Sequence, residues 1–182
     1  MGITQDTPSR DPDPARDFDL LYERFRLPVY RVIRGVVLDR DAAERLTQEA
    51  FERAYETHRR RRPTDAAAEP PQVWLFRVAV EAAFRYVHRS WWSRLGLDRL
   101  LRTDTSTREQ ATRSAAERVL WSLSPRHRAV VVLSFYARLS GQEMARVLQL
   151  PEAVVRVQLE FATELMRAAL SATDQPSGRE RL

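Results

Sequence analysis

Apolar residues recur at three- and four-residue steps along most of the chain, and this spacing predicts amphipathic α-helices and no strands. A first helix is expected from Asp17 through FDLLYERFRLPVYRVIRGVVL, and Pro28 should kink or split it. Asp39 can cap a second helix, RDAAERLTQEAFERAYETHRRR. A loop rich in helix breakers at residues 63–71 then precedes a third helix, QVWLFRVAVEAAFRYVHRSWW.

A second helical block follows a stretch that has few large apolar residues. This stretch, residues 93–114, is interpreted as a linker. A short helix is expected at residues 115–123. Ser124 can then cap a helix that begins at Pro125, because proline is favoured at the first helical position.

Residues 140–161 have the pattern of two helices joined by a tight turn. Ser140 and Glu143 form an S-x-x-E capping box for the first of them. Pro151 turns the chain into the second, which should end near residue 169. The apolar positions expected to hold the pair together are Met144, Ala145, Leu148, Leu150, Val155 and Leu159. Such a helix-turn-helix usually places its second helix in the major groove of DNA.

Composition excludes several classes of function. The chain of 182 residues has no cysteine, which removes disulfides, thiolate zinc sites and cysteine nucleophiles. Its three histidines lack ligand spacing, and its five glycines do not form a phosphate-binding loop. We find no paired carboxylates and no nucleophile with a base. We therefore expect no enzyme activity, no cofactor and no metal site.

The chain also lacks the pattern of a membrane protein. Its longest aliphatic run, AVVVL at residues 129–133, is far too short to span a bilayer. The N-terminus is acidic and rich in proline, unlike a signal peptide. We expect a soluble cytoplasmic protein without membrane insertion, with disordered tails at residues 1–16 and 171–182.

Charge is distributed unevenly along the chain, whose formal net charge is +5. Residues 85–102 hold five arginines and one aspartate, and residues 113–138 hold five arginines and one glutamate, so each segment carries +4. The last helix is different, because residues 152–167 hold two arginines and three glutamates, a net −1. The basic middle is compatible with nucleic acid, but an acidic second helix is unexpected in a DNA-reading helix-turn-helix.

Three segments together resemble the extracytoplasmic-function (ECF) sigma factors of bacterial RNA polymerase. They are DRDAAERLTQEAFERAYE at residues 39–56, VWLFRVAVEAAFRYVHR at 73–89, and LSPRHRAVVVLSFYARLSGQEMARVLQLPEAVVRVQL at 123–159. Each segment alone could be a generic amphipathic helix, and their order along the chain is the more specific signal.

The resemblance implies an all-α protein with two small helical domains. A sigma region 2-like domain would occupy residues 17–92, and a sigma region 4-like helix-turn-helix domain would occupy residues 115–170. The first would dock on core RNA polymerase and read the upstream melting element of promoter DNA. The second would read an element farther upstream, and the linker would thread through the polymerase. An anti-sigma factor is the expected regulator.

The resemblance assigns polymerase docking to the second helix. Its solvent face carries Asp41, Glu44, Gln48, Glu49 and Glu52, of which Gln48 and Glu49 match the family's Gln-Glu pair. The alternative is an ordinary solvated charged face. Arg45 stands where the family usually has aspartate, and a reversed charge in an interface can weaken binding.

The third helix carries the first group of candidate DNA contacts. Arg77, Arg85 and Arg89 recur at four- and eight-residue steps, which predicts a phosphate-contacting row or a solvated one. Tyr86 and Trp91 could stack on unpaired bases or pack against the linker. Two positions depart from the family: Glu81 replaces asparagine, and Arg85 replaces aspartate.

The second group lies in the helix-turn-helix block. Arg156 keeps the family's charge and Gln158 can hydrogen-bond adenine, but Val157, Glu160 and Phe161 cannot anchor phosphate. Upstream DNA contacts could instead come from the preceding helices, through Arg126, Arg128 and Arg138.

The turn before the last helix has Gln149 where the family usually has glycine, which reduces left-handed freedom. The sequence therefore supports a sigma factor and leaves one alternative, a degenerate sigma-like adaptor that acts through protein contacts without reading promoters.

Overall fold

The computed structural model describes residues 14–60, 69–96 and 115–173, and every element in these ranges is helical. The elements are α1 (Pro14–Val37), α2 (Arg40–Arg60), α4 (Pro71–Gly96), α6 (Ala115–Ser122), α7 (Pro125–Val131), the π-helical turn η1 (Val132–Tyr136), α8 (Gly141–Leu148) and α9 (Glu152–Thr173). The predicted all-α fold is confirmed. The predictions for residues 1–13, 61–68, 97–114 and 174–182 lie outside the described residues.

The helices α1, α2 and α4 pack against one another and form the first block. Pro28 lies inside α1 and does not split it. The helix continues because Val29, Val32 and Ile33, in the turns directly after the proline, are completely buried. This burial outweighs the backbone hydrogen bond that proline removes.

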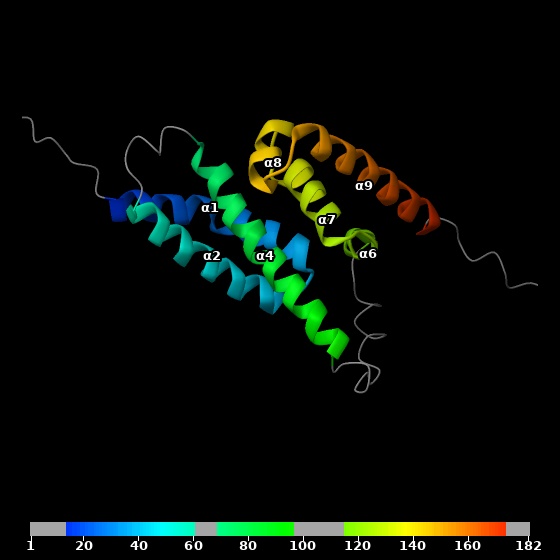
Figure 1. The fold of residues 1–182 in the computed structure, drawn as a ribbon, viewed down its shortest axis with the longest axis horizontal. Coiled ribbons are helices and arrows are strands. Elements are labelled where there is room, and N and C mark those ends of the chain that lie inside the picture. The colour runs from blue at the N-terminus through cyan, green and yellow to red at the C-terminus, as the bar shows by residue number, and fades with distance from the viewer. Residues whose placement is uncertain (1–13, 61–68, 97–114, 174–182) are drawn as a thin grey trace, which may run out of the picture.

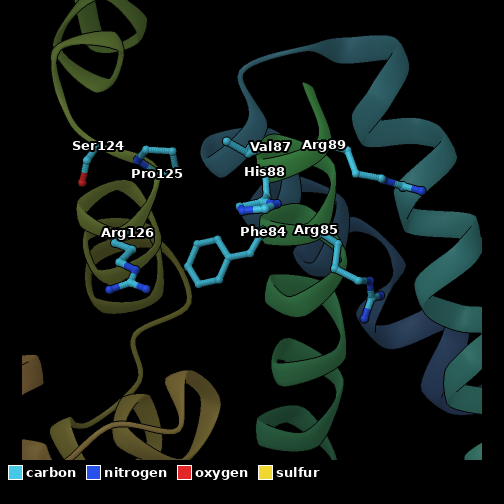
Figure 2. A pocket seen from close by; sticks show the side chains of 8 residues that line it. All are labelled: Phe84, Arg85, Val87, His88, Arg89, Ser124, Pro125 and Arg126. Carbon is cyan, nitrogen blue, oxygen red and sulfur yellow. The ribbon is translucent and has the colours of Figure 1, made fainter. Parts of the chain in front are cut away.

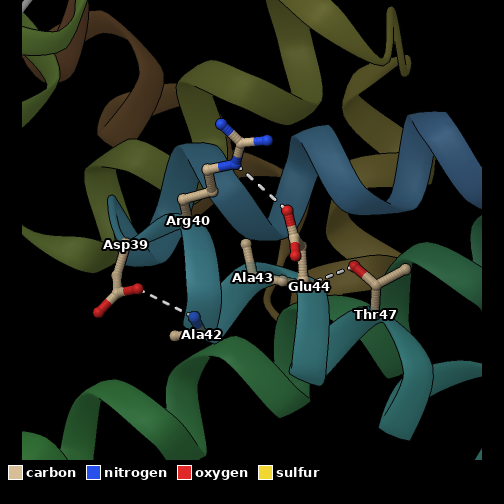
Figure 3. Close-up of polar contacts among 6 residues, drawn as sticks. All are labelled: Asp39, Arg40, Ala42, Ala43, Glu44 and Thr47. Carbon is tan, nitrogen blue, oxygen red and sulfur yellow. Dashed lines mark hydrogen bonds and ion pairs between the residues drawn. The ribbon is translucent and has the colours of Figure 1, made fainter.

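The junction between α1 and α2 is closed by a left-handed residue and a capping side chain. Leu38 ends α1 with a φ of 60°. The predicted cap at Asp39 is present, since its Oδ1 accepts a hydrogen bond from the Ala42 backbone at 2.9 Å (Figure 3).

Helix α4 is buried on almost every side over its first half. Trp74, Leu75 and Val78 are buried. Val73 and Phe76 are buried as well, so that four consecutive residues avoid water. A helix that is apolar all round must be covered from several directions. In Figure 1 it lies between the other helices of the first block and α7–α8 of the second.

The two blocks share one hydrophobic core. Buried residues of α1, α2 and α4 form a single cluster with residues of α7, η1, α8 and α9. A smaller cluster of Leu123, Val131 and Ala162 holds α6, α7 and α9 together. The blocks are separated along the sequence, as expected, but they are packed against each other in space (Figure 1).

The predicted helix-turn-helix is formed by α8 and α9. Ser140 and Glu143 make the expected capping box. Gln149 ends α8 in the left-handed conformation, with a φ of 54° and a ψ of 43°, and its backbone N–H donates to the Ala145 carbonyl. The turn therefore carries the backbone strain that the missing glycine predicts. Met144 and Val155 are buried between the helices, as predicted.

The capping box makes α8 sensitive to acid. Hydrogen bonds from the Ser140 backbone N–H and hydroxyl hold the pKa of the Glu143 carboxyl below its ordinary value. A depressed carboxyl pKa contributes stability above the unfolded-state pKa, and this contribution is lost as pH falls through the folded-state pKa. We expect Glu143→Gln to lower the free energy of unfolding at neutral pH and to converge with the wild type as the pH falls through that range.

The measurement is urea unfolding, followed by circular dichroism, at a series of pH values. Glu160→Gln, which changes an exposed carboxylate on α9, is the matched control. A Glu143→Gln difference that stays constant with pH would contradict the assigned role of the carboxylate.

Candidate polymerase and nucleic-acid interfaces

The acidic face predicted for polymerase docking lies on the outer side of α2. Asp41, Glu44, Gln48, Glu49 and Glu52 are all exposed. The opposite side of the helix is fixed in the core by Ala43, Leu46 and Phe51, which are buried. The five polar side chains therefore lie on a rigid element and face solvent.

Two contacts along α2 organise this face. Arg40 Nε lies 3.3 Å from Glu44 Oε1, an exposed ion pair at i and i+4 (Figure 3). Gln48 Nε2 donates to Glu52 Oε1 at 2.9 Å. Exposed pairs of this kind contribute only about 0.3–0.5 kcal/mol, so a partner could rearrange them at little cost. Arg45, the departure from the family pattern, is also exposed on this helix.

The predicted arginine row on α4 is only partly present. Arg77 makes a two-pronged ion pair with Glu69, with Nη1–Oε1 at 3.0 Å and Nη2–Oε2 at 2.7 Å, and both side chains are largely shielded. Twelve residues at 3.6 per turn also place Arg77 about 120° around the helix from Arg89. The expectation that Arg77 shares a face with Arg85 and Arg89 is therefore wrong, and its charge is already matched.

Arg85 and Arg89 are exposed and point toward α2 (Figure 2). The pKa of Arg85 is lowered, first by partial burial and then by the neighbouring charge of Arg53. Glu49 and Glu81 act in the opposite direction. Arg53 of α2 was not singled out in the sequence, because it lies on another helix. Its charge acts on Arg85, and we call Arg53, Arg85 and Arg89 the basic cluster, which has Glu49 and Glu81 beside it.

The contacts of Tyr86 and Trp91, the two aromatic candidates on α4, do not indicate that either residue stacks on unpaired bases. The Tyr86 hydroxyl donates to Asp39 Oδ2 at 3.4 Å, and its ring is half-buried against the core. Trp91 belongs to α4 by its backbone, and its side chain lies outside the described residues. Base stacking by these two residues stays a prediction.

A groove of about 790 Å³ separates the C-terminal half of α4 from the start of α7. Phe84, Val87 and His88 line its α4 side, and Arg126 lies on its α7 side (Figure 2). Arg85 and Arg89 also border it. The structure thus gathers three predicted DNA contacts, from two separate segments, around one groove.

The remaining predicted DNA contacts differ in how far they are exposed to solvent. Arg126, Arg138 and Arg156 are exposed, and Gln158 is half-buried on the flank of α9. Arg128 is a correction: it is buried, at 8% exposure, and its Nε has no hydrogen-bond partner. Burial lowers the pKa of Arg128 to about 10. Its position in the packed face of α7 excludes a phosphate contact in this conformation.

The exposed face of α9 is apolar along one edge and charged along the other. The apolar edge consists of Val154, Val157, Phe161 and Leu165, with Val157 62% and Phe161 50% exposed. The His127 ring of α7 lies 5.1 Å from the Phe161 ring, between centroids. Glu160 and Glu164 are exposed beside this stripe. These side chains offer no cation for a phosphate group.

Comparison with known proteins decides the family. Residues 21–93 match the family model for sigma-70 region 2, and residues 119–168 match the model for sigma-70 region 4. Together the matches cover about two thirds of the chain. The chain belongs to the sigma-70 family. Region 2 comprises most of α1 with α2 and α4, region 4 comprises α6–α9, and the resemblance to ECF sigma factors is confirmed.

Two solved structures show the same fold as this sigma-70 family member. CnrH, in complex with the cytosolic domain of CnrY, aligns with a TM-score of 0.65 at 23% identity over 87% of this chain and 90% of that chain. The sigma factor RpoE from Bartonella quintana, in complex with the anti-sigma factor NepR, aligns with a TM-score of 0.70 at 13% identity over 86% and 98%. No curated protein matches the chain.

Within residues 14–60, 69–96 and 115–173, no helix is long and apolar enough to cross a membrane. The same ranges contain no group of three or more potential metal ligands.

Proposed function

We propose that this sigma-70 family member binds core RNA polymerase through α2 and directs it to promoters in the cytoplasm. The observation that carries the proposal is the presence of both sigma regions, in order, with the whole predicted docking face of α2 exposed. In this proposal the protein performs no chemistry of its own. It supplies positioning and DNA contacts to the polymerase.

The DNA contacts of region 2 are assigned to the basic cluster of Arg53, Arg85 and Arg89. Three guanidinium groups in one environment favour a phosphate ligand over a neutral one, although Glu49 and Glu81 offset part of their field. The pKa of Arg85 is lowered first by partial burial and second by the Arg53 charge, which disfavours another cation beside it. A phosphate group would relieve that repulsion.

An anti-sigma factor is the proposed regulator. The two similar structures are complexes of CnrH with the cytosolic domain of CnrY and of RpoE with the anti-sigma factor NepR. Both alignments span the two blocks of this chain, which supports a partner of the same class.

The docking assignment predicts a charge-reversal effect. Glu49→Lys with Glu52→Lys should abolish co-purification with core polymerase. The polymerase surface is expected to bind acidic side chains, so it would repel the two lysines. The helical circular-dichroism spectrum should not change, since both positions are exposed. Arg45→Asp, which restores the family charge on the same face, should bind at least as well as the wild type.

Run-off transcription with purified core polymerase provides the functional readout for these variants. Wild-type co-purification and transcription by the doubly reversed variant, with its helical content intact, would refute the assignment of this face to the polymerase.

The basic cluster predicts a change in salt dependence. Each phosphate contact contributes a slope of about −0.9 in log affinity against log salt on duplex DNA, and about −0.7 on single strands. Arg85→Ala with Arg89→Ala should therefore flatten the slope by between about one and two units. Arg77→Ala is the matched control on the same helix, because Arg77 is already paired with Glu69. Fluorescence-anisotropy titrations at several salt concentrations give the slopes; equal changes in the two variants would rule out a specific role for the cluster.

A second candidate function, a sigma-like adaptor, is favoured by the surface of α9. An apolar stripe beside two glutamates suits a protein partner better than phosphate. In this alternative the helix-turn-helix keeps its fold and contacts a protein, and promoter reading by region 4 is lost.

The α9 surface predicts that added positive charge creates DNA affinity. The full-length protein should bind duplex DNA through region 4 only non-specifically, with dissociation constants around 10⁻⁴ to 10⁻⁶ M. Glu160→Arg with Phe161→Arg should tighten binding and steepen the salt slope by about one to two units. Leu20→Arg with Glu23→Arg, on the exposed side of α1, is the control with the same charge change. The prediction would be contradicted if the wild type bound DNA sequence-selectively at nanomolar concentrations and lost this binding on Arg156→Ala. Region 4 would then read promoters in the ordinary way.

A further inference from the structure

The exposed side of α1 carries two leucines and two arginines in a regular pattern. Leu20 and Leu27 are 62% and 51% exposed, and Arg24 and Arg31 are exposed as well. At about 100° per residue, these four positions fall within about 60° of one another around the helix. They therefore form one continuous strip of surface, which we call the leucine–arginine strip.

Each residue type in the strip repeats at a seven-residue spacing. Leu20 and Leu27 make one row, and Arg24 and Arg31 make a second row beside it. This is the spacing by which one helix packs along another, with apolar residues in the seam and charges on its edge that select the partner. Val29, on the opposite side of α1, is completely buried, so the core holds this helix firmly from behind.

Aromatic rings hold both arginines of the strip in place. Arg31 Nη1 donates to the Tyr136 hydroxyl of η1 at 3.3 Å, and the Arg31 guanidinium lies 5.6 Å from the centre of the Tyr136 ring. The Arg24 guanidinium lies 5.3 Å from the centre of the Phe25 ring. In the part of the chain that the structure describes, neither arginine takes part in an ion pair. The two cations are thus oriented, and their charge is not matched.

We propose that the leucine–arginine strip docks an acidic amphipathic helix of a partner protein. The apolar row of that helix covers Leu20 and Leu27, and carboxylates at seven-residue spacing beside it pair with Arg24 and Arg31. The inference goes beyond the proposed function, because it involves none of the residues assigned there to polymerase or DNA.

Charge complementarity decides that the partner helix is acidic. Covering Leu20 and Leu27 also removes water from the arginines beside them, and a charge that loses water without gaining a partner disfavours the contact. A carboxylate next to each guanidinium replaces the lost water with charge-assisted hydrogen bonds. A neutral or basic helix has the same apolar row to offer but leaves Arg24 and Arg31 unpaired.

A second copy of the chain and an anionic membrane both fit the strip less well. Antiparallel pairing of two strips sets the arginine row against itself, and parallel pairing sets Arg31 against Arg26, which is exposed on the same helix. An anionic membrane would meet Asp19 and Glu23, which are exposed on the leucine side of the strip. Like charges therefore oppose both alternatives.

The test uses the full-length protein and two labelled synthetic helices. One peptide carries leucine and glutamate rows at seven-residue spacing, and its companion has lysine in place of every glutamate. Fluorescence anisotropy should show that the wild type binds the glutamate peptide at least about tenfold more tightly than the lysine peptide. Leu27→Asp should weaken binding of the glutamate peptide by at least about tenfold, because it places a charge in the apolar row.

Charge exchange separates the strip from the overall charge of the protein. Arg24→Glu with Arg31→Glu should reverse the preference, so that the lysine peptide binds more tightly, and a variant that fails to fold cannot produce this gain. Arg26→Glu with Arg45→Glu makes the same change in net charge at exposed positions outside the strip and should keep the wild-type preference. Equal binding of the two peptides by the wild type, or equal effects of the two exchanges, would overturn the proposal.

Three further results would assign the strip to another occupant and refute the proposal. Light scattering that shows self-association of the wild type, lost on Leu27→Asp, would make the occupant a second copy. Binding to phosphatidylserine vesicles that is lost in the same variant would make it a membrane. Peptide binding that appears only after Asp6→Asn, Asp11→Asn and Asp13→Asn would make it the chain's own acidic N-terminal segment. Polymerase takes no part in these measurements, so their outcome is independent of the sigma function.

Discussion

The burial requirement of α4 determines how the rest of the molecule is arranged. Val73, Trp74, Leu75 and Phe76 are consecutive and each is no more than 3% exposed. Four consecutive residues pass completely around a helix, so no side of this turn can face water. Helices α1 and α2 cover only part of it, and α8 and α7 supply further cover. The position of region 4 thus follows from the need to remove the surface of α4 from water.

This arrangement also decides which charged surfaces remain available. The acidic face of α2 stays exposed along its length, and Glu49 in this face acts on Arg85 of α4. Arg77 lies near the covered part of α4 and pairs with Glu69, whereas Arg85 and Arg89 lie in its less covered half. Because burial decreases along α4, Arg77 is held in an ion pair, whereas Arg85 and Arg89 remain able to contact a ligand. Charge in the sequence alone does not make that distinction.

Local signals in the sequence were enough to predict the helices, the cap at Asp39, the Ser140–Glu143 capping box and the turn at Gln149, because each depends on residues a few positions apart. The solvent face of α2 was predicted for the same reason. The burial of Arg128 and the pairing of Arg77 were not, since both depend on neighbours that only the tertiary structure brings close. The shared core was also missed, although the apolar residues around α4 were its signal in the sequence.

Residues 152–167 of α9 carry a net charge of −1, whereas the basic residues gather elsewhere. At physiological salt the Debye length is about 8 Å, so Glu160 and Glu164 act directly on any phosphate near the exposed face of α9. Arg85, Arg89 and Arg126 lie instead around the groove between α4 and α7. Arg85 and Arg89 point toward α2 and away from Arg126, so positive charge lies on both sides of the groove rather than along α9 (Figure 2).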